Sequence, residues 1–542
     1  MLRPQTKPNT KLSAIVDHLA QYNPTAHGDL TQAVSGISMN SKTVESEDLY
    51  AAVAGAQHHG ADYIAEAVEA GATAILTDRS GIDRVPADLP YIVVDDVRSA
   101  LADAAAVIYG NSGASLPQLY GVTGTNGKTT TTYFLNALLA ALGHTTGLIG
   151  TIETRIAGTS IPSEFTTPEA PDLHSLIARM RESGVEVASM EVSSHAMAYK
   201  RTYGVLYGVA GFTNLTQDHL DLHGSMSEYF RAKATLFHED HSQVRVVTLN
   251  GGAEPKWGLE LAQHISDAVT LDLGPAAVTD QPTPPAMWRV TDFEPAGLGH
   301  AFTLQHESGM SVKTRVGMPG KFNIANAALA AVMVFAGHPR QDWERIKAAL
   351  EDADHTPFES AVPGRMEVIS DAPTVVVDFA HNPDGLTQAL QAVNRSSQQR
   401  HGTAGRTIVV FGATGQRDTA KRPLMGSIAA QHADVVIVTD DDPHYEDPAQ
   451  IREAVLQGAH DYAATAAERI EILEIAPRAD ALAYAVDLAG PTDTILAAGR
   501  GHETHQDLAG VAFPIDDRKV LHQALQDHGF VTTASASQHG AD

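Results

Sequence analysis

The sequence contains no cysteine, which excludes disulfide bonds, a thiol nucleophile and thiolate metal ligands. It is also poor in basic residues, because 37 Lys and Arg stand against 65 Asp and Glu, for a formal net charge of −28. A surface of this sign repels phosphate backbones and anionic lipids. We therefore expect no nucleic-acid partner and no membrane insertion.

Long apolar runs are lacking too. The longest candidate, residues 326–337, is too short to span a bilayer and predicts a buried helix. Residues 1–23 have no apolar signal core. A cytoplasmic protein is expected, and 542 residues predict several domains rather than a single core.

We predict three α/β domains, at residues 1–113, 114–355 and 356–542. The first alternates short apolar runs with helical stretches and ends in a turn-rich loop at 110–118. The second begins with a strand, a glycine-rich turn and a helix with Phe134, Leu138 and Leu142 on its apolar face. Its residues 244–318 have few helix signals, so strands are expected there.

The third domain contains apolar strand candidates separated by helical segments, which predicts a parallel, doubly wound sheet. The four candidates are residues 374–381, 407–415, 433–443 and 493–503. Each runs into polar residues at its carboxyl end, where such sheets bind ligands.

The strongest local motif is GVTGTNGKTT (121–130), between a predicted strand and a helix. The N–H groups of such a loop point at phosphates, Lys128 would reach the outer phosphates, and Thr129 would bind Mg²⁺. Val122 stands where the usual motif has its first glycine, and a turn without nucleotide is the alternative. We predict an ATP site that includes Gly124, Thr125, Asn126, Gly127, Lys128, Thr129 and Thr130. The segment GRGHE (499–503) lacks the third glycine of a dinucleotide fingerprint, which argues against a nicotinamide cofactor.

Eight further segments follow the loop in order: MEVSSHAMAYKR (190–201), FTNLTQDHLDLHG (212–224), EYFRAKATLF (228–237), GKFNIANAALA (320–330), GRMEV (364–368), DFAHNPDGL (378–386), RDTAKRPLMG (417–426) and GRGHE (499–503). Over about residues 36–520 this series resembles the Mur ligases, and among them the MurE group.

The resemblance implies a small α/β UDP-substrate domain, a central P-loop ATPase-like α/β domain and a C-terminal Rossmann-like domain that brings an amino acid. It also implies an ATP-dependent ligase of peptidoglycan precursor synthesis. The implied substrates are ATP, a diamino acid and UDP-N-acetylmuramoyl-L-alanyl-D-glutamate, whose γ-carboxylate is activated as an acyl phosphate. We expect a monomer.

Site residues follow from the same resemblance. Lys128, His219 and Lys233 are expected to be catalytic, and Thr129, Glu191, His219 and Lys233 to hold Mg²⁺. Lys233 is expected to be carbamylated by CO₂, which requires burial and a lowered pKa, although its polar neighbours alone would predict a surface lysine. Further ATP contacts are implied for Asn323, Arg365, Asp378 and His381. Contacts to the UDP-substrate are implied for Met39, Ser41, Thr166, Thr167, Ser193 and Arg201.

Two residues depart from the family pattern near the peptide: Phe165 stands where asparagine is common, and Tyr199 where some members have glutamine. The histidines of His219-x-Asp221-x-His223 would share one face of a strand and suggest zinc. No motif supplies further zinc ligands, so Mg²⁺ at His219 and an ordinary loop histidine at His223 are preferred.

The amino-acid contacts implied are Arg417, Asp441, Asp442, His444, Gly499 and Glu503. Members that add meso-diaminopimelate have Asp-Asn-Pro-Arg where this chain has Asp441-Asp442-Pro443-His444. Histidine cannot make the two-point contact of arginine with a carboxylate, and the acidic run favours a distal ammonium. We therefore predict L-lysine, with L-ornithine next and meso-diaminopimelate as the further alternative.

Other interpretations of the acidic run and of the whole chain remain open. Glu446 and Asp447 are equally typical of a salt-bridged turn. For the whole chain, the alternatives are a ligase like folylpolyglutamate synthase, a P-loop small-molecule kinase and a non-catalytic binding protein.

Overall fold

The computed structural model describes residues 2–55, 58–111, 117–278, 283–401, 405–467 and 469–532. The chain forms two compact units. The first comprises Met1–Thr123, Leu139–Gly211 and Ala232–Arg245, and the second comprises Gly124–Leu138, Phe212–Arg231 and Val246–Asp542. The predicted boundary at 113/114 lies outside the described residues, and the one at 355/356 stays a prediction.

The N-terminal part of the first unit has a five-stranded sheet with helices on both faces. The strand order is β2-β7-β6-β5-β4, and β2 alone runs antiparallel to its neighbour. Leu49 and Ala51 of β5 face a core with α1 and α3, while Tyr50 and Ala52 belong to a second core with α2. This alternation follows from the period of two of a strand. The elements are α1 (Leu12–His18), β2 (Thr25–His27), β4 (Gly36–Ser38), β5 (Asp48–Ala51), α2 (Ile64–Ala70), β6 (Ala72–Thr77), β7 (Tyr91–Val93) and α3 (Val97–Ile108).

An eleven-stranded sheet has the order β11-β10-β9-β12-β8-β13-β14-β15-β16-β17-β18. Parallel pairing of β8 with β12 and of β12 with β9 places the ends of these strands at one edge. The strands are β8 (Gln118–Thr123), β9 (Thr146–Ile149), β10 (Glu153–Ile156), β11 (Thr159–Pro162), β12 (Val187–Glu191), β13 (Tyr207–Phe212), β14 (Ser242–Thr248), β15 (Val269–Asp272), β16 (Trp288–Ala296), β17 (Gly299–His306) and β18 (Ser311–Val316).

The helices between these strands largely follow the sequence patterns. Phe134 and Leu138 are buried on α4 and Leu142 is buried directly after it, and the residues at 326–337 that predicted a buried helix belong to α10. The prediction of strands over 244–318 is confirmed for β14–β18, but α9 interrupts them. The helices are α4 (Lys128–Ala141), α5 (Ala170–Glu182), α6 (Ser194–Ala198), α7 (Leu220–His223), α8 (Met226–Ala234), α9 (Lys256–His264), α10 (Lys321–Gly337) and α11 (Trp343–Leu350).

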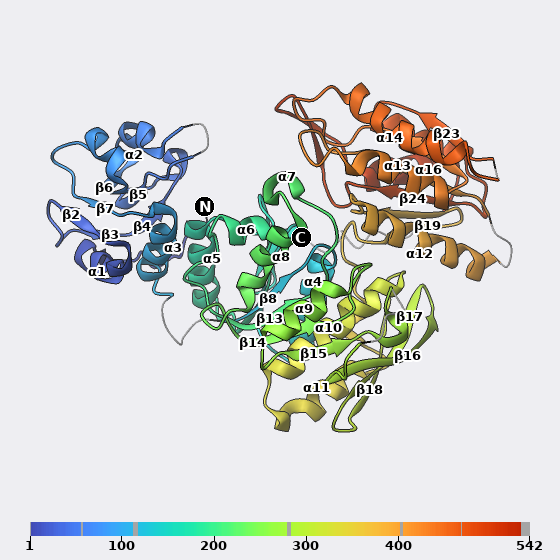
Figure 1. The fold of residues 1–542 in the computed structure, drawn as a ribbon, viewed down its shortest axis with the longest axis horizontal. Coiled ribbons are helices and arrows are strands. Elements are labelled where there is room, and N and C mark those ends of the chain that lie inside the picture. Colours follow the sequence, from blue (N-terminus) through green and yellow to red (C-terminus); the bar gives the residue numbers. More distant parts are fainter. Residues whose placement is uncertain are drawn as a thin grey trace. The chain divides into compact units, whose positions relative to one another are not determined.

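The C-terminal domain is the predicted doubly wound sheet, in the order β19-β20-β24-β21-β22-β23 (Figure 1). All neighbours are parallel except β19, which adds an antiparallel edge. The elements are β19 (Glu367–Asp371), β20 (Thr374–Asp378), α12 (Pro383–His401), β21 (Thr407–Phe411), α13 (Lys421–His432), β22 (Val435–Val438), α14 (Pro448–Ala463), β23 (Glu471–Glu474), α15 (Arg478–Leu488), β24 (Thr494–Ala498), β25 (His505–Leu508), β26 (Val511–Pro514) and α16 (Asp517–Asp527).

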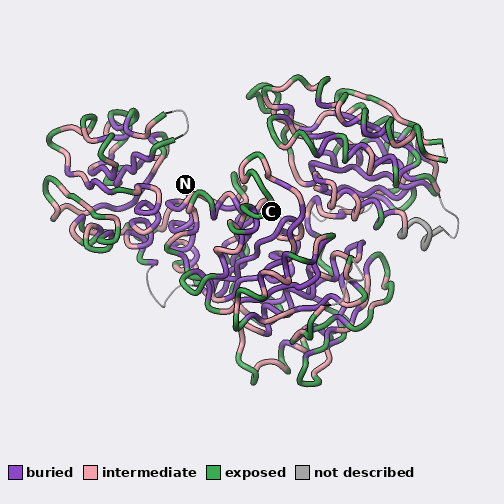
Figure 2. Tube along the Cα trace, viewed as in Figure 1, coloured by how far each residue is buried: buried purple, intermediate pink, exposed green. Residues whose placement is uncertain are grey.

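Both faces of this sheet are covered. Val375, Ile408 and Ile495 point into a core with α15 and α16, whereas their neighbours in sequence are buried on the opposite face. Buried strands with exposed outer helix faces are visible in Figure 2. Four segments rich in polar residues follow β20, β21, β22 and β24, so the parallel order brings them to one edge of the sheet.

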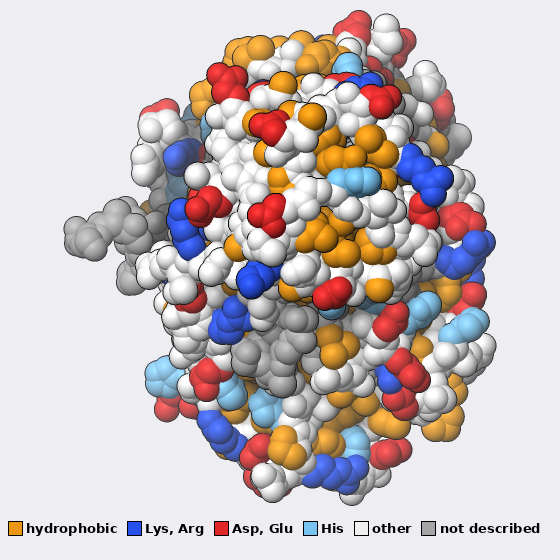
Figure 3. Space-filling view, turned by 90° about the vertical axis from the view of Figure 1, so that its left-hand side faces the viewer, with side chains coloured by type: hydrophobic (Ala, Val, Ile, Leu, Met, Phe, Trp, Pro, Cys, Tyr) orange, Lys and Arg blue, Asp and Glu red, His pale blue; other side chains and the backbone are white. Residues whose placement is uncertain are grey.

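The charge of −28 is not gathered in a single region of the face drawn in Figure 3. Acidic, basic and apolar side chains are interspersed there. Such mixing is typical of a solvated surface.

Candidate active site

The loop between β8 and α4 has the geometry of a phosphate-binding turn. Gly124 and Gly127 have φ values of +149° and +88°, and a Cβ on Gly127 would lie 2.2 Å from Asn326 Oδ1. The Lys128 ammonium lies over the loop and donates to the carbonyl oxygens of Gly124 (3.0 Å) and Thr125 (2.9 Å). Because the N-terminus of α4 follows directly, loop N–H groups and the helix dipole favour an anion here.

Side chains of the second unit hold this loop. Thr125 Oγ1 contacts the hydroxyl of buried Tyr229 at 3.1 Å and the carbonyl oxygen of Thr216 at 3.2 Å. Asn126 N donates to Asn214 Oδ1 at 3.1 Å. Sequence analysis missed Tyr229, whose only signal is its place four residues before Lys233 on α8.

Glu191 ends β12 in the first unit, as the apolar strand before it predicts. The residue is 1% exposed, and its carboxylate accepts hydrogen bonds from Thr151 N (2.7 Å) and Thr151 Oγ1 (3.1 Å). Gly150 permits this approach, since a Cβ there would lie 2.5 Å from Glu191 Oε1. A buried carboxylate of this kind is a hard oxygen ligand of the type Mg²⁺ prefers.

Lys233 is 1% exposed on α8, so the prediction of a surface lysine from its polar neighbours is wrong, and the burial that a carbamate requires is present. His219 lies in the second unit with φ +54° at the start of α7. Residues 220–223 are helical, so the strand on which zinc binding by His219 and His223 was premised does not exist. The rings of both histidines lie against Tyr229, at centroid distances of 6.1 and 5.1 Å.

Asp218 is a buried carboxylate that sequence analysis missed. Its oxygens lie 3.4 Å from His381 Nε2, 3.7 Å from His219 Nε2 and 3.8 Å from Lys421 Nζ. Burial opposes ionisation, but the hydrogen bond from His381 and the electrostatic interactions with His381, His219 and Lys421 hold the pKa of Asp218 well below its usual value.

Most of the other predicted ATP contacts are engaged within the protein. Arg365 lies 4.3 Å from the centroid of the Phe379 ring and donates to Thr129 Oγ1 at 3.3 Å. Asp378 accepts from the backbone N–H groups of Met366 (2.7 Å) and Ala380 (2.8 Å), and burial raises its pKa. Asn323 is fully buried; it donates to Pro319 O and accepts from Asn326 Nδ2, and thereby supports the residue that packs on Gly127.

The residues predicted for the UDP-substrate all lie in the first unit. Thr167 Oγ1 binds the backbone between β12 and α6, because it donates to Glu191 O (2.8 Å) and accepts from Ser193 N (3.0 Å). Thr166 Oγ1 accepts from Thr151 Oγ1 at 3.0 Å, and Ser193 Oγ caps α6. Met39 packs on the N-terminal core, and Ser41 is buried in the turn after β4.

The two departures from the family pattern surround Arg201. Its guanidinium lies 5.1 Å from the Phe165 ring centroid and 5.9 Å from that of Tyr199, and both rings are exposed. Glu169 lies 2.9 Å from Arg201 Nε and accepts from Arg98 Nη1 at 3.2 Å. Two guanidinium groups thus share a single carboxylate, which leaves one positive charge for an anionic substrate.

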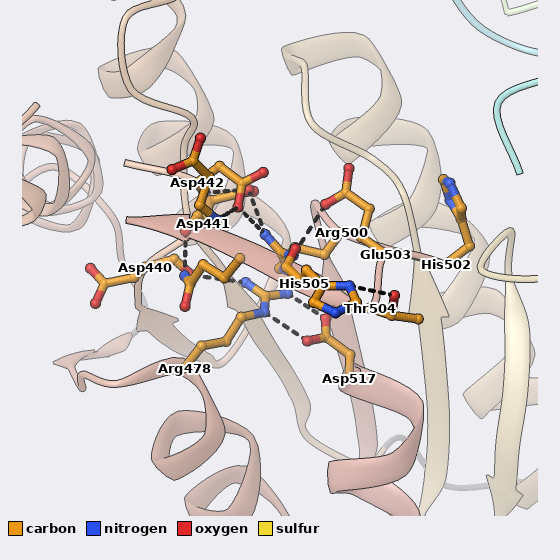
Figure 4. A network of polar contacts seen from close by, with 12 residues as sticks. Asp440, Asp441, Asp442, Arg478, Arg500, His502, Glu503, Thr504, His505 and Asp517 are labelled. Carbon is orange, nitrogen blue, oxygen red and sulfur yellow. Dashed lines mark hydrogen bonds and ion pairs between the residues drawn. The ribbon is translucent and has the colours of Figure 1, made fainter. Parts of the chain in front are cut away.

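Acidic side chains gather after β22 and β24 (Figure 4). Asp441, Asp442 and Glu503 each offer an oxygen within 4.8 Å of the others. The buried guanidinium of Arg500 lies 2.6 Å from Asp442 Oδ1, 3.5 Å from Asp441 Oδ1 and 3.4 Å from Glu503 Oε2. Gly499 allows the backbone to approach the Asp441 carboxylate closely, since a Cβ on this residue would lie 2.7 Å from Asp441 Oδ2.

One guanidinium is shared by three carboxyl groups. The nearby Arg478 compensates only in part, because Asp517 holds it with hydrogen bonds of 2.9 and 2.6 Å. Burial and the charge of Asp441, followed by that of Asp442, raise the pKa of Glu503 to about 8 despite Arg500. The cluster therefore attracts a further cation.

The loop after β22 is fixed at both of its ends. His444 Nδ1 lies 3.0 Å from Asp507 Oδ2, and Glu446 accepts two hydrogen bonds from the buried Arg422. Asp447 caps α14, so the ordinary interpretation of Glu446 and Asp447 as turn-forming residues is confirmed. Arg417, predicted to contact the amino acid, is exposed.

Comparison with known proteins identifies the family of the chain. Three family models match: "Mur ligase family, catalytic domain" at residues 33–109, "Mur ligase middle domain" at 122–334 and "Mur ligase, glutamate ligase domain" at 364–501. A UDP-N-acetylmuramoyl-L-alanyl-D-glutamate--2,6-diaminopimelate ligase of Streptomyces coelicolor is 39% identical over 530 residues, which are 97% of this chain and 98% of the relative. The chain belongs to the MurE group of the Mur ligase family.

Further similarities extend over the same length. A UDP-N-acetylmuramyl-tripeptide synthetase of Leifsonia xyli is 41% identical over 535 residues, 98% of each chain. A solved structure of a UDP-N-acetylmuramoyl-L-alanyl-D-glutamate--2,6-diaminopimelate ligase has a TM-score of 0.62 and 27% identity, and covers 96% of this chain and 100% of that one. As a Mur ligase, this protein is an ATP-dependent ligase that forms an amide bond. Among its described residues, no helix is long and apolar enough to cross a membrane.

Proposed function

We propose that this Mur ligase joins a diamino acid, L-lysine, to the D-glutamate γ-carboxylate of UDP-N-acetylmuramoyl-L-alanyl-D-glutamate in peptidoglycan precursor synthesis. The observation that carries the choice of amino acid is the cluster of Asp441, Asp442 and Glu503 around the single guanidinium of Arg500. Its unbalanced negative charge suits the distal ammonium of lysine. L-ornithine fits the same charge with a shorter chain.

Meso-diaminopimelate remains the alternative, since the Streptomyces coelicolor relative is named for 2,6-diaminopimelate. A second carboxylate needs a cation, and in this loop His444 is already paired with Asp507. A histidine in that state is a poor substitute for the two-point contact of an arginine. The loop of this chain therefore favours lysine.

In the proposed reaction, the γ-carboxylate attacks the terminal phosphorus of ATP to form an acyl phosphate and ADP. The α-amine of the diamino acid then attacks the acyl carbon, and the tetrahedral intermediate releases phosphate as the amide forms. Two anions meet in the first step, so positive charge must offset their repulsion. Lys128 over the phosphate loop supplies part of that charge, and the dipole of α4 supplies more.

The donor set also fits Mg²⁺. Thr129 at the start of α4, the buried carboxylate of Glu191 and the imidazole of His219 are the residues we propose to hold it, with Lys233 as a carbamate. When bound, Mg²⁺ would neutralise phosphate charge. Arg201 with Arg98, Thr166, Thr167, Ser193, Met39 and Ser41 are proposed to bind the UDP-substrate, and Asn323, Arg365, Asp378 and His381 to support the ATP site.

The deciding experiment measures phosphate release from ATP with the UDP-muramoyl dipeptide and, separately, L-lysine, L-ornithine, meso-diaminopimelate or no amino acid. Mass spectrometry identifies the UDP-tripeptide formed. We expect release and product with L-lysine. Product with meso-diaminopimelate alone would overturn the lysine assignment but keep the ligase. Equal release without any amino acid would instead indicate a phosphotransferase.

A further inference from the structure

The hairpin of β25 and β26 lies beside the loop that follows β22, 63 residues earlier in the sequence for the pair His444–Asp507. His444 N donates to Asp507 O at 3.2 Å, and Ala509 N donates to His444 O at 2.7 Å. A parallel bridge joins His444 to Leu508. The hairpin therefore fixes the backbone of His444, which has φ +51°.

Asp507 contacts both residues that distinguish this loop from Asp-Asn-Pro-Arg. Its carboxylate Oδ2 lies 3.0 Å from His444 Nδ1, and its backbone N donates to Asp442 Oδ1 at 2.9 Å. Its other oxygen accepts from Gly510 N at 2.8 Å, which sets the orientation of the carboxylate. The hydrogen bond and charge of His444 lower the pKa of Asp507, so the carboxylate is ionised at neutral pH.

These contacts restrict what the loop can offer a ligand. Asp442 Oδ1 already accepts from Arg500 Nη1 (2.6 Å) and from Asp507 N (2.9 Å), so ligand contacts fall to Oδ2. Any cationic side chain at position 444 would face the Asp507 carboxylate before it faced a substrate. A positive charge at 444 is therefore neutralised within the protein.

We propose that Asp507 is a specificity-determining positioning residue: it engages the side chain at position 444 and orients Asp442, so that carboxylates and no unpaired cation meet the distal end of the amino acid. The proposal rests on the proposed function in that the amino acid binds beside Asp442 and His444. It adds that position 444 does not set specificity by itself.

The test compares Asp507→Asn, His444→Arg and the double variant with the full-length wild type. Steady-state phosphate release gives kcat and KM for L-lysine and for meso-diaminopimelate at saturating ATP and UDP-dipeptide. For Asp507→Asn we expect the KM for L-lysine to rise about fivefold with little change in kcat, because the loop is less well positioned. His444→Arg alone should raise kcat/KM for meso-diaminopimelate only slightly. The double variant should have a kcat/KM for meso-diaminopimelate about tenfold higher than that of His444→Arg.

A matched control is Asp487→Asn, which removes a second, exposed Asp–His contact of 3.2 Å, between Asp487 of α15 and His528, the residue directly after α16. It should leave both amino-acid KM values unchanged. Asp507→Glu keeps the charge, so its KM for L-lysine should lie between those of the wild type and Asp507→Asn. Thermal unfolding of every variant checks that it is folded.

The proposal is overturned if His444→Arg alone gains as much diaminopimelate activity as the double variant, or if Asp507→Asn leaves the KM of the preferred amino acid unchanged. A wild type that uses only meso-diaminopimelate would refute the lysine assignment separately. In that case Asp507→Asn must still alter the KM for diaminopimelate if the role of Asp507 is correct.

Discussion

Arg422 holds Glu446 by a two-point ion pair, with Nη1 2.6 Å from Oε1 and Nη2 2.8 Å from Oε2. The guanidinium belongs to the first turn of α13 and is buried, and the carboxylate belongs to the loop before α14. The pair thereby connects the start of α13 to the loop after β22, which borders the proposed amino-acid site.

The first prediction concerns acid stability. The hydrogen bonds from Arg422 lower the pKa of Glu446 to about 2, below the 4.5 of the unfolded chain. Its stabilisation is therefore present above pH 4.5 and is lost as the pH falls towards 2. Glu446→Gln should lower the free energy of unfolding by about 1–3 kcal/mol at pH 7, because it weakens the partner of a buried guanidinium.

Urea unfolding between pH 3 and pH 7 measures this difference, which should shrink as the pH falls. Glu453→Gln, on the exposed side of α14, is the control and should follow the wild type throughout. A gap between Glu446→Gln and the wild type that does not change with pH would contradict the assignment.

Glu503 should have the opposite pH dependence. Burial and two neighbouring carboxylates raise its folded pKa to about 8, so its relative stabilisation is fully present below pH 4.5 and is lost as the pH rises through 8. The wild type should therefore lose stability relative to Glu503→Gln between pH 4.5 and 8. Urea unfolding of the amino-acid-free proteins tests this, and parallel stability curves would show that the pKa is not raised.

Gly127 and Gly158 allow a matched test of the phosphate loop. Both have φ +88°, but a Cβ on Gly127 would lie 2.2 Å from Asn326 Oδ1, whereas a Cβ on Gly158 would meet nothing within 4 Å. Alanine at either position costs about 1–2 kcal/mol of backbone strain. Only Gly127→Ala should lower the free energy of unfolding by more than this backbone strain, and only Gly127→Ala should raise the KM for ATP.

Unfolding free energies and ATP kinetics of the two variants separate these effects. Adding Asn326→Ala to Gly127→Ala should recover part of the excess loss of stability. Equal destabilisation by both single variants would mean that the contact with Asn326 has no energetic weight.

The burial of Lys233 leads to a chemical-rescue prediction. Lys233→Ala should lower the rate of phosphate release about 100-fold or more, because it removes the proposed carbamate ligand. Formate or acetate should restore part of the rate by supplying a carboxylate. Lys256→Ala, at a lysine with 64% side-chain exposure, should keep full activity. Full activity of Lys233→Ala without added acid would refute the carbamate.

Phe165 and Tyr199 should affect the UDP-substrate through Arg201. Exposed contacts of a guanidinium with an aromatic ring are worth about 0.5–1 kcal/mol. Phe165→Asn and Tyr199→Gln should thus each raise the KM for the UDP-dipeptide about two- to fivefold, with kcat nearly unchanged. Leu206→Ala, an exposed apolar residue of the same unit, serves as control. A fall in kcat with an unchanged KM would contradict this role.

Local patterns were sufficient to predict much of the fold. Runs of β-branched residues predicted β20, β21, β22 and β24, and the glycine-rich turn before Lys128 predicted the phosphate loop, because backbone preference and phosphate geometry are short-range properties. The strand β23 was missed since its four residues are only partly buried, and α9 because it is short. The MurE assignment also followed from the sequence, through motifs in a fixed order.

The sequence by itself thus determined the α/β class, the glycine-rich turn between β8 and α4, and the family. Only the tertiary structure decided which polar residues are buried and which charges meet. The burial of Lys233 depends on what packs against α8, and the pairs Arg422–Glu446 and His444–Asp507 join residues 24 and 63 positions apart. Electrostatic interactions act through space, and spacing along the chain does not encode such distances when intervening helices and strands set them.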